Sequence, residues 1–186
     1  LDGGSIADSL GNTATGTNHG ATPTADRFGA AAGALSFGGG SYVQTQQGSN
    51  FKPQSFSVWF KAEDIAGTQS IVDSDVCGQF GHNLVIGYGD EDSGRLAVMY
   101  HNGSYLSAYV VTPGQWTHAT VTYSDRVRLY VDKTLVLDQP YTGSSFDGSD
   151  FRFGQHCGGY ASYRGAIDDV RFFGSALTAT QVGNLY

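Results

Sequence analysis

The sequence predicts an all-β fold: two antiparallel sheets packed as a β-sandwich, a jelly roll, with a short C-terminal helical turn. Its 186 residues include 27 glycines, 11 tyrosines and 11 phenylalanines, but only two glutamates and three lysines. Aromatic residues favour strands and glycines favour turns, whereas glutamate and lysine favour helices. Short alternating segments separated by polar turns support the same fold class. The length favours a single domain spanning residues 1–186.

The N-terminal part combines a polar segment with the first two strands. Residues 1–33 are small and polar, rich in glycine, alanine and threonine. The segment ALSFGGGSYVQT, residues 34–45, then predicts two short strands around a glycine-rich turn. Leu35, Phe37 and Val43 are expected to face the core, because side chains alternate along a strand.

The next segment, SFSVWFKA over residues 55–62, alternates strictly. Phe56, Val58 and Phe60 should face one side of its strand. Further strands are predicted in SIVDSD (70–75), NLVIGYG (83–89), GRLAVMYHN (94–102), SYLSAYVV (104–111), QWTHATVTYS (115–124), RVRLYVDKTLVLDQ (126–139), DFRFGQ (150–155) and YRGAIDDVRFF (163–173). After them, Thr178 and Gln181 predict a capping box at the start of a helix.

The charge balance argues against several function classes. The net charge of −7 disfavours nucleic acid, whose binding depends on cationic contacts to phosphate. It is compatible with cation binding, with neutral ligands, or simply with solubility. No apolar run approaches the roughly 20 residues of a membrane span, so membrane insertion is not expected. Because Leu1 is not a methionine, we expect a piece of a longer, multidomain protein.

Five segments in this order resemble the laminin-G-like modules of the concanavalin A-like lectin/glucanase superfamily, as found in bacterial extracellular proteins. They are SFSVWFKA, SIVDSD, QWTHATVTYSDRVRLYVD, FRFGQ and YRGAIDDVRFFGSALTATQVGNLY. The resemblance runs from about Asp8 to Tyr186, and its C-terminal motif is the most specific part. It implies a concanavalin A-like jelly roll in a secreted or cell-surface protein. Lys133 departs from the usual glycine, so that hairpin turn should differ or carry strain.

The resemblance also implies a structural calcium ion. Its ligands would be Asp8, Asn18 and Asp168, with backbone carbonyls completing the oxygen shell. Strand alternation would put Asp168 and Asp169 on opposite faces, leaving Asp169 to meet Arg171 or solvent. Alternatively, both aspartates make only salt bridges or turn hydrogen bonds. Related modules can hold a second calcium at the rim, for which Asp73, Asp75 and Asn83 are the candidates.

The two cysteines, Cys77 and Cys157, each lie in a glycine-rich loop. We predict that they form a disulfide; two unrelated buried thiols are the alternative. The bridge would join two loops at one rim of the sandwich.

Sugar rings stack their apolar faces on aromatic side chains, while their hydroxyl groups pair with polar ones. Tyrosines, histidines and other polar residues near the cysteine loops therefore suggest a binding surface, although for any single tyrosine packing is the favoured interpretation. The candidate ligand-binding residues are Gln79, His82, Tyr88, Tyr100, His156, Tyr160, Tyr163 and Arg164.

Catalysis is disfavoured because the expected carboxylates are missing. Glycosidases of this superfamily use a Glu-x-Asp-x-x-Glu strand, and neither Glu63 nor Glu91 has that spacing. We therefore predict no catalytic residues and a calcium-stabilised, lectin-like carbohydrate-binding module that attaches a larger protein to a glycan or polysaccharide. The alternative is a protein-binding or structural adhesion module without a sugar site, and a glycoside hydrolase is a weaker one.

Overall fold

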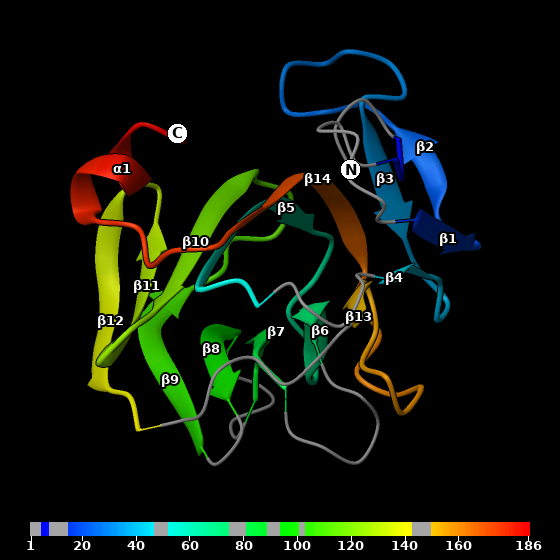
Figure 1. The fold of residues 1–186 in the computed structure, drawn as a ribbon. Helices are drawn as coiled ribbons and strands as arrows, with labels where there is room; N and C mark the ends of the chain where they lie inside the picture. Colours follow the sequence, from blue (N-terminus) through cyan, green and yellow to red (C-terminus); the bar gives the residue numbers. More distant parts are fainter. Residues whose placement is uncertain are drawn as a thin grey trace.

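The computed structural model describes residues 5–7, 15–46, 52–74, 81–88, 94–100, 103–142 and 150–186. Within these residues, two antiparallel sheets of seven strands each confirm the predicted sandwich (Figure 1). Sheet A has the order β1 (Thr15–His19), β4 (Tyr42–Gln46), β13 (Asp150–Phe153), β6 (Gln69–Asp73), β7 (Asn83–Ile86), β8 (Arg95–Tyr100) and β9 (Gly103–Val110). Sheet B has the order β12 (Thr134–Pro140), β11 (Arg126–Val131), β10 (Thr117–Tyr123), β5 (Ser55–Ala62), β14 (Gly165–Phe173), β3 (Ala34–Phe37) and β2 (Thr22–Thr24).

The core lies between the inner faces of the two sheets. Phe56, Val58 and Phe60 of β5 are fully buried in it, as their alternation predicted. Leu84 of β7 and Val98 of β8 belong to the same core from the opposite sheet. The alternation thus places these apolar side chains on the core face of their strands.

The segment over residues 34–45 forms two strands that belong to different sheets. Strand β3 pairs with β14 in sheet B, whereas β4 pairs with β13 in sheet A. The chain crosses between the sheets at a turn closed by the Ser41 amide, which donates to the Gly38 carbonyl at 3.0 Å. Leu35, Phe37 and Val43 all face the core, as predicted.

The turn between β11 and β12 shows the strain expected at Lys133. Asp132 and Lys133 have φ angles of 45° and 72°, so both central residues are in the left-handed region. Two-residue hairpins need this conformation, which glycine and asparagine adopt more easily than lysine. The Asp132 carboxylate accepts a hydrogen bond from the His118 amide at 2.9 Å, which helps to hold the turn.

A short helix, α1 (Ala179–Gly183), follows the last strand, and the predicted capping box is present. The Gln181 amide donates to the Thr178 hydroxyl, while the Thr178 amide donates to the Gln181 side chain at 2.9 Å. Val182 anchors the helix because its side chain is fully buried. Among the described residues, none of the helical structure is long and apolar enough to cross a membrane.

Three aromatic rings pack on the outer face of sheet B, the face turned away from the core. Trp59 of β5 lies 5.0 Å from the His118 ring and 5.3 Å from the Tyr186 ring, measured between centroids. Burial lowers the pKa of His118 to about 4; the Asp169 carboxylate opposes this shift, and Arg27 and Arg171 add to it. His118 is therefore neutral in the folded protein at neutral pH.

This buried histidine predicts a loss of stability in acid. Between pH 6.5 and pH 4 the unfolded chain binds a proton at His118 that the folded protein does not. The free energy of unfolding should fall by about 3 kcal/mol over that interval from this group alone. Urea unfolding of the wild type and of His118→Gln at both ends of the interval measures this component. An equal loss in both proteins would contradict the assignment.

Candidate functional site

The two adjacent aspartates of β14 lie at a β-bulge. The pairing of β14 with β5 shifts register between Asp168 and Arg171, and Asp169 has a φ of 47°. The bulge cancels the strand alternation, so both carboxylates reach the guanidinium group of Arg27. Its Nη1 donates to Asp168 Oδ2 at 2.7 Å, and its Nη2 donates to Asp169 Oδ2 at 3.2 Å. The expectation that these aspartates face opposite sides is therefore wrong.

The result is a mostly buried cluster of two aspartates and two arginines. Asp169 also accepts from Arg171 Nε at 2.7 Å, a pairing that the sequence anticipated. Burial raises the pKa of Asp168, and the positive charge of Arg27 opposes that rise. Asp168 Oδ1 is buried and has no hydrogen-bond partner among the described residues.

These contacts do not fit the calcium ligands implied for Asn18 and Asp168. A guanidinium group already occupies the Asp168 carboxylate, and its charge disfavours a second cation there. The Asn18 side chain is bonded to Ala21, accepting from its amide at 2.8 Å and donating to its carbonyl at 2.9 Å. Asn18 also lies in sheet A, whereas Asp168 lies in sheet B. Asp8 is outside the described residues, so calcium binding there stays a prediction.

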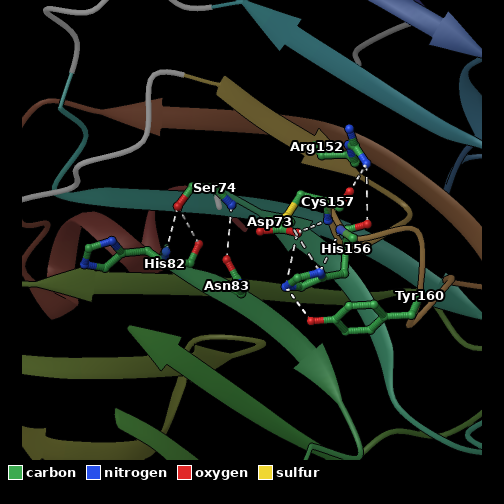
Figure 2. Close-up of polar contacts among 9 residues, drawn as sticks. Asp73, Ser74, His82, Asn83, Arg152, His156, Cys157 and Tyr160 are labelled. Carbon is green, nitrogen blue, oxygen red and sulfur yellow. Dashed lines mark hydrogen bonds and ion pairs between the residues drawn. The ribbon is translucent and has the colours of Figure 1, made fainter. Parts of the chain in front are cut away.

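The candidate rim metal site is also partly outside the described residues, since Asp75 is not among them. Of the other two ligands, Asn83 accepts from the Ser74 amide at 3.1 Å through its side-chain oxygen. Asp73 accepts from the Cys157 amide at 2.7 Å (Figure 2). Both side chains thus have backbone partners, and a second calcium stays a prediction.

Three of the predicted sugar-contacting residues are buried and offer no surface to a ligand. The Tyr163 side chain is fully buried in the core, where its hydroxyl donates to the Ala166 carbonyl at 3.3 Å. His82 is 1% exposed and its Nε2 lies 2.7 Å from the Tyr141 hydroxyl. Tyr100 is 8% exposed, and its hydrogen bond to Tyr105 raises the pKa of Tyr100 to about 12. Their aromatic rings serve packing because the flanking strands turn them inward.

The other candidates separate into different parts of the surface. Arg164 forms a bidentate ion pair with Asp64, at 2.7 Å and 2.6 Å, which lowers the pKa of Asp64 to about 2. Tyr88 is exposed beyond the end of β7. Gln79 and Cys77 lie outside the described residues, so the disulfide with Cys157 stays a prediction. His156 and Tyr160 are the two candidates that the structure brings together.

His156 and Tyr160 belong to a loop that is tied to sheet A by backbone hydrogen bonds. The Tyr163 amide donates to the Gly154 carbonyl at 2.8 Å, and the His156 amide donates to the Tyr160 carbonyl at 3.2 Å. The Ser70 amide of β6 donates to the Ala161 carbonyl at 2.8 Å. A loop closed and anchored in this way holds its side chains in a fixed arrangement.

The Tyr160 ring stacks on the His156 ring, with centroids 4.3 Å apart and planes 22° off parallel. Tyr160 is 63% exposed, so much of its side chain is accessible to solvent. Gly158 permits this fold of the loop, because a Cβ at that position would lie 2.5 Å from the Tyr160 ring. The pair forms a rigid, exposed aromatic platform.

Hydrogen bonds and close contacts of its ring nitrogens hold the His156 ring in place. The Gly158 amide donates to His156 Nδ1 at 3.1 Å, so Nδ1 acts as the acceptor. Its other ring nitrogen, Nε2, lies 4.0 Å from Asp73 Oδ2 and 3.4 Å from the Tyr160 hydroxyl (Figure 2). The fully buried Asp73 carboxylate thus lies beside the ring that supports Tyr160.

Beside the platform, polar side chains form a row across the outer face of sheet A. Strand register aligns Thr17 with Gln44, Gln44 with Arg152, and Arg152 with Asp73. Arg152 donates to the Gln44 side chain at 3.1 Å and to the Cys157 carbonyl at 3.0 Å. Its guanidinium group also connects the loop that carries the platform to the strands beside it.

A second ring pair lies at the other end of this row. Tyr42 of β4 stacks on His19 of β1 with centroids 4.3 Å apart, and the Arg152 guanidinium lies 4.2 Å from the Tyr42 ring. The sequence pattern carries no signal for this group, because its members come from segments far apart in the chain. Only the pairing of β1, β4 and β13 brings them together.

Comparison with known proteins matches the sequence to a family and the fold to solved structures. A family model described as the concanavalin A-like lectin/glucanases superfamily matches residues 37–183. A search of curated protein sequences finds no significant match. One similar solved structure is domain 4 of AbnA, an extracellular arabinanase from Geobacillus stearothermophilus, in complex with arabinotriose. The two chains are 22% identical with a TM-score of 0.75, over 97% of this chain and 92% of that one.

Binding domains of bacterial toxins share the same fold. The receptor binding domain of botulinum neurotoxin D is 15% identical with a TM-score of 0.77, over 98% of this chain. A structure of botulinum neurotoxin type C, whose cell entry depends on two ganglioside molecules, is 15% identical with a TM-score of 0.70, over 97% of this chain. This chain spans 49% and 48% of those two chains. At such identities the likeness concerns the fold alone.

Proposed function

This chain belongs to the concanavalin A-like lectin/glucanase superfamily, and from that premise we propose that it is a non-catalytic carbohydrate-binding module of a larger secreted or cell-surface protein. The observation that carries the proposal is the largely exposed Tyr160 ring, held by its stack on His156. A sugar ring would stack on the exposed part of this ring. The side chains of Arg152 and Gln44 provide hydrogen-bonding groups on the same side of sheet A.

Two similarities support a glycan as the ligand. AbnA domain 4, which has the same fold, was solved with arabinotriose, and the type C toxin interacts with gangliosides. The arabinanase is also extracellular, which supports the proposed location. Arabinotriose and gangliosides are ligands of those two proteins. The sugar that this chain would bind has to be identified by experiment.

The arrangement of the aspartates supports binding without hydrolysis. Glycoside hydrolysis needs two carboxylates that face a bound sugar from either side of the bond to be cleaved. Asp168 and Asp169 are instead 2% and 6% exposed, and both are paired with Arg27. They are therefore suited to holding β14 in place.

The proposal predicts that Tyr160→Ala weakens glycan binding about tenfold or more, because the stacking surface is lost, whereas Tyr160→Phe keeps most of the affinity. A glycan array identifies ligands, and calorimetry with the strongest of them measures each variant. Phe28→Ala is a matched control, since Phe28 is an exposed ring, 80% exposed, in the loop that follows β2.

Gly158→Ala gives an independent test of the same platform. Its new methyl group would displace the Tyr160 ring without removing it, so affinity should fall while Tyr160 remains present. Gly174→Ala is the control, because a Cβ there would meet nothing within 4 Å. Unchanged affinity in both Tyr160→Ala and Gly158→Ala, or the absence of any bound glycan on the array, would refute the proposal.

A further inference from the structure

We propose that this module binds an extended stretch of a glycan chain along the outer face of sheet A, with a separate contact at each end of the Thr17–Gln44–Arg152–Asp73 row. This inference rests on the proposed function and adds the length of the ligand to it. The module would recognise a chain of several linked sugars and not a single terminal sugar.

The first observation is that the two ring pairs are built alike. Each places two rings 4.3 Å apart, at 19° for His19–Tyr42 and at 22° for His156–Tyr160. In each pair the outer ring is exposed and the inner ring is held by other contacts. His19 is the exposed member of one pair, and Tyr160 is the exposed member of the other. Each pair thus presents one supported aromatic face to solvent.

The second observation is the distance between the pairs. His19–Tyr42 lies on β1 and β4, and the loop of His156–Tyr160 is bound to Asp73 of β6 through the Cys157 amide. The exposed ring of one pair, His19, lies on β1, which is three strand spacings, or about 14 Å, from β6. The exposed ring of the other pair, Tyr160, stacks on His156, whose Nε2 lies 4.0 Å from Asp73 of β6. A single sugar ring is too small to reach from His19 to Tyr160, whereas an oligosaccharide can.

The third observation is the polar connection between the two pairs. Arg152 contacts the Tyr42 ring on one side and the carbonyls of His156 and Cys157 on the other. Gln44 accepts from Arg152 through its side-chain oxygen at 3.1 Å, and its side-chain nitrogen takes no part in that hydrogen bond. These groups suit the hydroxyls of sugars that lie between the two ends. Arg152 thus connects the Tyr42 ring to the backbone of the loop that carries His156 and Tyr160.

The length of the ligand provides the decisive test. The probes are linear arabino-, xylo-, galacto- and gluco-oligosaccharides from one sugar to six, together with ganglioside oligosaccharides, and affinities are measured by calorimetry. We expect affinity to rise about tenfold or more between the shortest oligosaccharide that binds and those long enough to reach both pairs. Tyr160→Ala should weaken binding at every length. His19→Ala and Tyr42→Ala should weaken the long ligands only.

Melting curves identify any variant that fails to fold, and His19→Ala is the safer substitution because its side chain is exposed. If His19→Ala and Tyr42→Ala bind every length like the wild type while Tyr160→Ala does not, the extended site is refuted and the proposed function stands. The same holds if affinity does not depend on length. If Tyr160→Ala also binds normally, or no probe binds, both proposals fail.

Discussion

Replacing Gly165 with alanine is expected to destabilise the protein by about 3 kcal/mol, one of the two largest effects that we anticipate. Gly165 begins β14 with a φ of 147°, a conformation that side chains rarely adopt. An added Cβ would overlap the Lys61 carbonyl of β5 and lie 2.7 Å from the Tyr163 hydroxyl and 2.9 Å from the Ala62 Cα. Because two of these atoms are backbone in the neighbouring strand, the sheet itself would have to move.

Thermal unfolding measures the effect of Gly165→Ala. A loss of this size in a chain of this length lowers the Tm by about 6–12 °C. Gly174→Ala lies just beyond the same strand, and its Cβ would meet nothing within 4 Å. A Tm of Gly165→Ala that stays within a degree or so of this control would show that the strand adapts to the methyl group.

Replacing Arg27 with methionine should cost a similar amount, about 3 kcal/mol. The change removes the cation from Asp168 and Asp169 while keeping an apolar side chain of comparable length. Asp168 is 2% exposed, so its charge would be left without solvent or a close partner. Arg171 would still neutralise Asp169, which makes Asp168 the source of most of the loss.

A matched variant isolates the effect of burial. Arg128→Met removes a surface arginine that lies 3.4 Å from Asp138, and such exposed pairs contribute about 0–1 kcal/mol. Denaturant unfolding of both variants should therefore give clearly different losses. Equal losses would mean that the cluster around Arg27 is no more important than a surface pair.

Thermal unfolding in calcium and in EDTA tests the calcium ion implied by the family resemblance. A calcium ion bound through Asp168 would stabilise the native state, so EDTA would lower the wild-type Tm. The contact with Arg27 leads us to expect that EDTA has the same effect on the wild type and on Asp168→Asn. An EDTA effect that is present in the wild type and absent in Asp168→Asn would instead support the calcium site.

The positions of the strands could be predicted from the sequence because local patterns encode them. The alternation in SFSVWFKA predicted the whole of β5 and its buried face, and Thr178 with Gln181 predicted the helix cap. The departure at Lys133 correctly indicated an unusual turn, since two consecutive residues there have positive φ. Each of these features depends on residues that are close in the chain.

The candidate site was much harder to predict from the sequence, and the wrong predictions have physical causes. Tyr163 and Tyr160 are three residues apart in one loop, yet one is in the core and the other is exposed. Asp168 and Asp169 share a partner because a bulge interrupts the alternation that the pattern assumed. That partner, Arg27, lies 141 residues away from Asp168 in the chain. Spacing in the sequence carries no information about such contacts.

The amino-acid sequence by itself determined the all-β class, the order of most strands, the capped helix and the resemblance to lectin-like modules. These follow from side-chain alternation, turn chemistry and a family motif, which are all local. The tertiary structure alone decided that Tyr42, Arg152 and Tyr160 share one face of sheet A, and that Arg27 holds the two aspartates. The physical reason is that strand register in a sandwich joins segments that are distant in the chain, and the proposed binding face consists of those junctions.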